Sequence, residues 1–237
     1  MNIKEMQYDL KFKLNKIDSS QYKNLRIPEI DWVLNESIEL FVKNIAQPRF
    51  SQILGFEINQ RNIDDIRTLV VDKKDLTVIK IDDKTYYVEL PEDYLFYAAS
   101  RVSLKKNKCV ATDIRCTVRS HGDLFEDSPF DNSSFEWEDI NITFYEKGIK
   151  IYTDGTFEVT DFFLDYIKKP KYVHNAEDFS NTGYKALNGT LLTGHSDCDL
   201  PEHTHREIVD IAVLLITGDL IQNYQIKKEK ININKFN

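Results

Sequence analysis

The chain has 237 residues, 41% of them hydrophobic and 30% charged, so it can bury one large core or two small ones and lacks a disordered composition. Its formal net charge of −8 argues against a protein that grips nucleic-acid phosphates, because such binding requires clustered Lys and Arg. We expect neither a signal peptide nor a membrane span, because the first residues are charged and no apolar run approaches roughly 20 residues.

The N-terminal third predicts two helices, and we assign residues 1–66 to this helical part. Apolar residues at three- and four-residue steps give the first helix one buried face, formed by Ile3, Met6, Leu10, Leu14 and Ile17. The second helix begins near Pro28, and Glu29 and Asp31 favour the positive end of its dipole. It ends before Pro48, and its apolar stripe comprises Ile30, Val33, Leu34, Ile38, Phe41, Val42 and Ile45.

Residues 67–198 predict a β-rich insert of short β-branched runs separated by turns. Lys147-Gly148 and Asp154-Gly155 each lie between two strand patterns, and an Asp-Gly pair there is a strong hairpin signal. Several antiparallel strands joined in this way predict a sandwich or a partly closed barrel. The stretch 120–139, rich in Asp and Ser, predicts a long exposed loop.

The stretch YYVELPEDYLFYAASRV, residues 86–102, predicts a corner between sheet and core rather than a catalytic site. Pro91 lacks a donor for a sheet ladder and ends the strand before it. Glu92 and Asp93 then favour a single helical turn. From Tyr97 onward the sequence fits either a helix or a strand.

Residues 199–237 predict a long helix followed by a tail rich in Lys and Asn. The helix begins at Asp199 or Leu200, with Pro201 and Glu202 in its first turn. Its broad apolar surface indicates burial against the N-terminal helices and comprises Ile208, Val209, Ile211, Ala212, Val213, Leu215, Ile216 and Leu220. The predicted fold is therefore α+β, a helical bundle from both chain ends that carries an inserted antiparallel β-sandwich or partial barrel.

The best candidate for chemistry is a cluster of possible zinc ligands, His195, Cys198, His203 and His205. However, His203 and His205 lie two residues apart at the start of a helix and so point about 200° away from each other. We therefore expect solvent-facing histidines here, with no metal and no other cofactor. No nucleophile with a paired base and no glycine-rich phosphate loop is recognisable, so we expect no enzymatic activity.

What remains are surfaces for binding other proteins. Large aromatic side chains are enriched at protein interfaces, although most aromatics belong to cores. The lysines of the C-terminal tail form either a docking arm or a disordered extension. The candidate interface residues are Tyr94, Phe96, Phe125, Phe130, Trp137, Lys227, Lys228 and Lys230.

Three segments together resemble the tail tubular protein A-like family of phage head-to-tail adaptor proteins. YYVELPEDYLFY resembles the Leu-Pro corner of that family, LDYIKKPKYV a later strand end, and DLPEHTHREIVDIAVLLI the closing helix. The order of elements, with two helices first and a long helix last, is also similar. Among such proteins, the chain is most similar to the ring proteins stacked below the portal in crAss-like phages. The resemblance spans roughly residues 28–222.

The resemblance implies a structural virion protein, assembled in the host cytoplasm, about twelve copies of which form a closed head-to-tail connector ring below the portal. It implies as partners further copies of the chain, the portal protein and other tail or ring proteins, and no membrane. DNA would pass through the lumen without specific binding, because acidic side chains repel it. Two other functions stay open, a metal-dependent hydrolase that uses the 195–205 cluster and a non-virion assembly adaptor.

Overall fold

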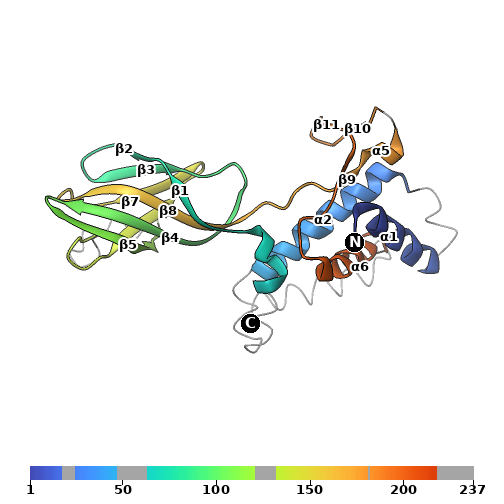
Figure 1. Cartoon of the computed structure of the whole chain (residues 1–237), viewed down its shortest axis with the longest axis horizontal. Coiled ribbons are helices and arrows are strands. Elements are labelled where there is room, and N and C mark those ends of the chain that lie inside the picture. The colour runs from blue at the N-terminus through green and yellow to red at the C-terminus, as the bar shows by residue number, and fades with distance from the viewer. Residues whose placement is uncertain (18–24, 47–62, 121–131, 181, 218–237) are drawn as a thin grey trace. The chain divides into compact units, whose positions relative to one another are not determined.

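The computed structural model of the chain describes residues 1–17, 25–46, 63–120, 132–180 and 182–217. It divides into two compact units, whose elements are labelled in Figure 1. The helical unit comprises Met1–Leu69 and Pro170–Asn237, and the β unit comprises Val70–Lys169. Helices from both chain ends pack together and a barrel-like sheet is inserted between them in sequence, which confirms the predicted α+β class.

The helical unit is built on α1 (Ile3–Ile17), α2 (Ile27–Ala46) and α6 (His205–Thr217). α6 packs against both α1 and α2, as predicted. The apolar faces of the three helices point inward. Their buried hydrophobic residues are Ile3, Met6, Leu10 and Leu14 on α1, Ile30, Leu34, Ile38, Phe41 and Val42 on α2, and Ile208, Val209, Ala212 and Val213 on α6.

The C-terminal helix begins later than the sequence predicted. Pro201 has an extended backbone (φ −57°, ψ 143°), and a short 3₁₀ helix, η2 (Glu202–Thr204), follows it and leads into α6. The buried Leu200 therefore precedes the helical segment rather than capping α6. A second 3₁₀ helix, η1 (Arg67–Leu69), ends the N-terminal part of the helical unit.

Residues 170–198 belong to the helical unit, whereas the sequence assigned them to the β-rich insert, 67–198. This connector contains two short antiparallel pairs and one short helix: β9 (His174–Asn175) with β12 (His195–Ser196), β10 (Tyr184–Lys185) with β11 (Leu191–Leu192), and α5 (Ala176–Phe179). β9 contacts α1 and α2, and α5 contacts α2. Isolated buried residues such as Val173 and Ala176 anchor the connector. Because they do not recur at helical or strand spacing, the sequence pattern did not predict their burial.

The β unit is one mixed, nearly closed sheet in the strand order β1-β8-β4-β5-β6-β7-β3-β2. Its strands are β1 (Val70–Leu76), β2 (Val78–Lys80), β3 (Thr85–Glu89), β4 (Tyr94–Lys106), β5 (Cys109–Val118), β6 (Ile140–Phe144), β7 (Gly148–Tyr152) and β8 (Glu158–Lys168). The predicted partial barrel is confirmed. One neighbouring pair, β5 and β6, is parallel. Parallel neighbours need a long connection, and residues 119–139 between these two strands supply one.

The two turns that were predicted to form hairpins have different outcomes. Lys147-Gly148 joins β6 to β7 as an antiparallel pair, as predicted. The Asp154-Gly155 prediction is wrong, because β7 and β8 are not neighbours in the sheet. The turn itself is present, since Gly155 has a φ of +86°. A turn sequence fixes the local backbone but not the next pairing partner, and β8 pairs with β4 and β1 instead.

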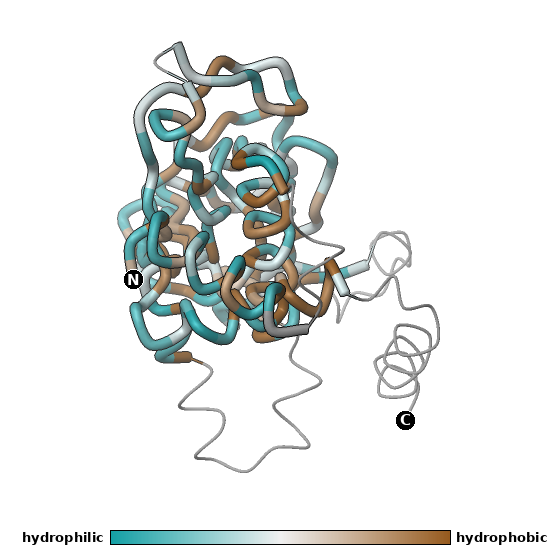
Figure 2. Tube along the Cα trace, turned by 90° about the vertical axis from the view of Figure 1, so that its right-hand side faces the viewer, coloured by the Kyte–Doolittle hydropathy of each residue, from teal (hydrophilic) through white to brown (hydrophobic). Residues whose placement is uncertain are grey.

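The two ends of the strand order, β1 and β2, are consecutive in the chain with only Thr77 between them. This segment pairs with β8 through its first half and with β3 through its second half, which draws the sheet toward closure. Figure 2 shows hydrophobic and hydrophilic stretches interspersed along the trace of the described residues. The core inside the sheet includes Val102, Leu104, Ile142, Ile149, Ile151, Phe162 and Leu164.

The stretch around Pro91 is the corner that links β3 to β4, two strands that are not neighbours. β3 ends at Glu89, and the Tyr94 N–H donates a hydrogen bond to the Pro91 carbonyl at 3.0 Å. The predicted helical turn is therefore a tight turn, and the chain continues as a strand from Tyr94. Asp93 fixes the corner by accepting a hydrogen bond from the Tyr166 hydroxyl at 2.9 Å.

Candidate interaction surfaces

Trp137 is the most exposed of the predicted interface residues that the structure describes, with 85% of its surface accessible. It stands on the turn 134–139, which two backbone hydrogen bonds close: Ser134 N to Asp139 O at 2.8 Å and Asp139 N to Ser134 O at 3.2 Å. The neighbouring Phe135 packs against the core of the β unit, with its ring centroid 6.0 Å from that of Phe157. The turn therefore fixes the backbone at Trp137 and leaves its indole in the solvent.

The other predicted interface residues are placed less favourably or lie outside the described residues. Tyr94 and Phe96 are half-buried, and the Tyr94 ring centroid lies 5.9 Å from that of Tyr166. Burial raises the pKa of the Tyr94 phenol. The residues outside the described ranges are Phe125, Phe130, Lys227, Lys228 and Lys230.

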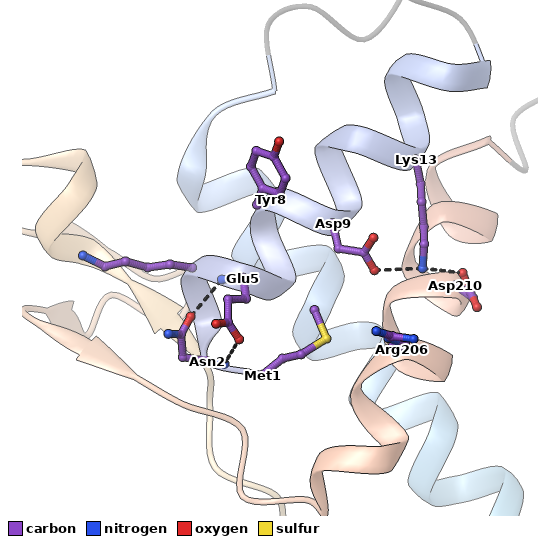
Figure 3. A pocket seen from close by; sticks show the side chains of 9 residues that line it. Met1, Asn2, Glu5, Tyr8, Asp9, Lys13, Arg206 and Asp210 are labelled. Carbon is purple, nitrogen blue, oxygen red and sulfur yellow. Dashed lines mark hydrogen bonds and ion pairs between the residues drawn. The ribbon is translucent and has the colours of Figure 1, made fainter.

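A groove of about 710 Å³ runs along α1 and α6 in the helical unit (Figure 3). Lys13 crosses between the two helices, with its Nζ 2.9 Å from Asp9 Oδ2 and 2.8 Å from Asp210 Oδ1. The exposed Tyr8 stands on the α1 side, and Arg206 lies on the α6 side. The groove thus combines an accessible aromatic ring with a row of charged groups.

Most of the charged groups that line this groove are already engaged. The Lys4 ammonium lies 3.1 Å from a carboxylate oxygen of Glu177 and 3.1 Å from one of Asp178. Glu5 accepts a hydrogen bond from the Asn2 N–H at 3.0 Å. Within the described ranges, by contrast, Arg206 has no hydrogen-bond or ion-pair partner for its guanidinium. Because Lys13 is shared by Asp9 and Asp210, and Glu5 is met only by a neutral N–H, the groove carries uncompensated charge of both signs.

His195 and Cys198, two members of the predicted metal-binding cluster, lie in different surroundings. His195 Nδ1 lies 3.4 Å from Glu177 Oε1, on the exposed side of β12. Burial raises the pKa of the Cys198 thiol to about 11, which keeps it protonated at neutral pH.

The other two histidines of the cluster also have separate partners. His203 Nε2 lies 2.7 Å from Asp65 Oδ1. His205 is buried, contrary to the expectation that it faces solvent, and its Nε2 donates a hydrogen bond to the Leu200 carbonyl at 3.0 Å. Among the described residues, no three His, Cys, Asp or Glu side chains are grouped as they would be around a metal ion.

A buried carboxylate on α2 is the feature of the helical unit that the sequence interpretation missed. Asp31, assigned to the helix dipole, has 0% of its surface accessible. It accepts hydrogen bonds from the Asn175 N–H at 3.0 Å, from the Tyr184 hydroxyl at 2.7 Å and from Gln7 Nε2. These donors belong to β9, β10 and α1, so one side chain fastens both the connector and the first helix to α2.

Burial dominates the electrostatics of this contact. Desolvation raises the pKa of the Asp31 carboxyl above its ordinary value, while the hydrogen bonds from Asn175, Tyr184 and Gln7 act in the opposite direction. The pKa of the Tyr184 phenol is raised as well, by burial and by its hydrogen bond to Asp31.

We expect the contribution of Asp31 to stability to fall as the pH rises. Because the folded-state pKa is raised, this contribution is fully present below the unfolded-state pKa and is lost as the pH rises through the folded-state pKa. This contribution is measured by denaturant unfolding of the wild type and of Asp31→Asn across acidic and neutral pH. The asparagine side chain does not titrate in this range. The stability of the wild type relative to Asp31→Asn should decrease toward neutral pH, and a flat or rising difference would contradict the prediction.

No protein-family model matches the chain, and no curated protein matches it. In the part of the chain that the structure describes, no helix has both the length and the apolar character of a membrane span.

Proposed function

We propose that the chain is a structural virion protein, a subunit of a head-to-tail connector ring that docks below a portal and forms part of the DNA channel. The observation that supports this most is the arrangement of the chain, in which both ends build one helical unit and a β unit is inserted between them. This agrees with the element order of the adaptor family that the 86–97 corner and the 199–216 segment resemble.

The surfaces of the two units suit a protein that acts by contact. A closed ring needs two different surfaces on each subunit, so that one side of a subunit fits the opposite side of the next. Trp137 on the β unit and the α1–α6 groove on the helical unit are two such dissimilar surfaces. The net charge of −8 favours passage of DNA without adhesion, since like charges repel.

No contact in the described residues favours either of the two alternative functions, a metal-dependent hydrolase or a non-virion adaptor. A hydrolase that uses the 195–205 cluster would need several of its side chains to face one ion, whereas His203 and His205 have separate partners. A non-virion adaptor would use the same exposed surfaces as a ring subunit. Mass spectrometry of purified particles separates these two possibilities, because a connector subunit stays in the particle and an assembly adaptor leaves it.

The direct test is assembly on a portal. The purified chain is mixed with the portal complex from the same particle, and electron cryo-microscopy compares the mixture with the portal alone. We expect a ring of additional density on the tail side of the portal. Absence of such density, together with absence of the chain from purified particles, would refute the proposed function.

A further inference from the structure

A pocket of about 300 Å³ lies in the β unit, where three connections between strands meet. Asp83 belongs to the connection from β2 to β3, Asn107 to that from β4 to β5, and Thr156 to that from β7 to β8. Tyr86 of β3 and Phe157 line the pocket and belong to the core of the unit, so they form its inner wall. The volume is at the lower end of the range of small-molecule sites, which also occur at the mouths of barrels.

This inner wall carries a buried polar group without a partner. Tyr86 has only 3% of its surface accessible, and its hydroxyl makes no hydrogen bond with any residue that the structure describes. The pKa of the Lys80 ammonium is raised, chiefly by its hydrogen bond to Asp83 and to a smaller extent by the Tyr86 phenol, so the phenol oxygen lies near this ammonium. A buried hydroxyl without a partner destabilises the folded chain, and a ligand that supplies one removes this penalty.

Three exposed polar groups around the pocket are also free to meet a ligand. The side chains of Lys105, Asn107 and Glu158 make no hydrogen bond or ion pair to another described residue. Lys105 and Glu158 are register partners across β4 and β8, so a group that only donates stands next to one that only accepts. Asn107, whose amide does both, is held in the β4–β5 turn with a φ of +56°.

The charges that line the pocket balance, because two lysines face two carboxylates: Lys80, Lys105, Asp83 and Glu158. Lys80 Nζ is already paired with Asp83 Oδ1 at 3.1 Å. A ligand with a net charge of either sign would therefore meet repulsion as well as attraction. A hydroxyl both donates and accepts, so a molecule with several adjacent hydroxyls can satisfy the ammonium, the carboxylate and the amide together.

We propose that this pocket binds an uncharged polyhydroxylated ligand, with the chemistry of a monosaccharide unit. Its hydroxyls accept a hydrogen bond from Lys105, donate one to Glu158 and pair with the amide of Asn107. The lysine side chains at the pocket have many rotamers and turn aside, so that a further hydroxyl reaches that of Tyr86. The inference goes beyond the proposed function, because a connector ring needs no small ligand.

A zwitterion is the nearest alternative ligand. The ammonium and carboxylate of glycine suit Glu158 and Lys105, but glycine has no hydroxyl to pair with Tyr86. An anion such as inorganic phosphate is attracted by Lys105 and repelled by Glu158. A sugar is therefore the ligand that engages all four unpartnered groups.

Nuclear magnetic resonance titration of the isotope-labelled full chain tests the site. D-glucose, D-galactose, D-mannose and N-acetyl-D-glucosamine are added separately, and glycine and inorganic phosphate probe the other ligand classes. At least one sugar should shift the amide signals of Asn107, Gly155 and Glu158 with a Kd of about 1–10 mM, as expected for a ligand of about 12 non-hydrogen atoms. The amides of α2 and α6 should not shift.

Disaccharides distinguish a free sugar from the end of a longer glycan. Maltose or lactose that binds at least as tightly as the monosaccharide identifies the end unit of a glycan as the ligand. Weaker binding of both identifies a free sugar. Either result agrees with the proposal.

Tyr86→Phe is the sharpest variant, because it removes only the unpaired hydroxyl. It should keep or raise the stability of the chain in denaturant unfolding and weaken sugar binding about fivefold, the contribution of one hydrogen bond. Tyr87→Phe is its matched control, since the next side chain of β3 lies on the opposite face of the sheet. Lys105→Ala should also weaken binding about fivefold, whereas Lys108→Ala, at an exposed lysine outside the pocket lining, should not.

Four results would overturn the inference. None of the sugars shifts the pocket amides at about 100 mM, well above the expected Kd. Glycine or phosphate binds there more tightly than every sugar. Tyr86→Phe and Lys105→Ala bind sugar as the wild type does. Tyr86→Phe lowers stability where Tyr87→Phe does not, which would show that the hydroxyl already has a partner.

Discussion

Asp31→Ala is expected to lower the free energy of unfolding of the helical unit by about 3–5 kcal/mol, because it leaves buried donors without an acceptor. The Asn175 N–H, the Tyr184 hydroxyl and the Gln7 amide all donate to this carboxylate. Each unpaired buried donor costs about 1–3 kcal/mol, and alanine supplies no oxygen in its place. Denaturant unfolding followed by circular dichroism measures the loss.

Glu36→Ala is the matched control for this prediction. Glu36 lies on the same helix but is exposed, so its replacement should change stability by no more than about 0.5 kcal/mol. Hydrogen exchange locates the effect, since the amides of β9 and β10 should lose protection together with those of α1. If Asp31→Ala were as stable as Glu36→Ala, Asp31 would not be the fastening point that its hydrogen bonds indicate.

Phe162→Ala is expected to destabilise the β unit by about 3–5 kcal/mol, the usual cost of truncating a buried aromatic ring. Phe162 has 0% of its surface accessible and lies on β8. It stands opposite Leu76 of β1 and Val102 of β4, so the cavity opens where three strands meet. Loss of the ring therefore weakens the pairing on both sides of β8.

Hydrogen exchange is the measurement for this second variant. The amides of β4 and β8 should lose protection, while those of α2 and α6 should keep it, because Phe162 belongs to the core of the β unit alone. Val110→Ala on β5, a site that is 62% exposed, serves as the control and should stay within about 0.5 kcal/mol of the wild type. An equal loss of protection in the helices would argue against two separate cores.

Periodic signals in the sequence predicted the helical unit well. Ile3, Met6, Leu10 and Leu14 recur at helical spacing and all of them are buried. The α1–α6 groove was not predicted, because it depends on which surfaces remain uncovered after the helices have packed.

Features that depend on long-range partners were missed. Asp31 precedes Leu34 by three residues and Ile38 by seven, so helical spacing places it on the buried stripe, but its polarity suggested the helix dipole instead. Asp154-Gly155 correctly predicted a turn, but it did not predict that β8 pairs with β4 and β1. The partners of His203 and His205 likewise follow from packing rather than from spacing.

The segment that contains β1, Thr77 and β2 affects the tendency of the chain to aggregate when many copies are close together. An exposed sheet margin templates strand addition and aggregation. Here the two margins are joined covalently, and β1 is interrupted by a bulge between Val71 and Lys74, where Lys73 has a φ of +46°. The bulge disrupts the regular row of backbone groups that an added strand would need, so strand addition at β1 is disfavoured when copies are crowded.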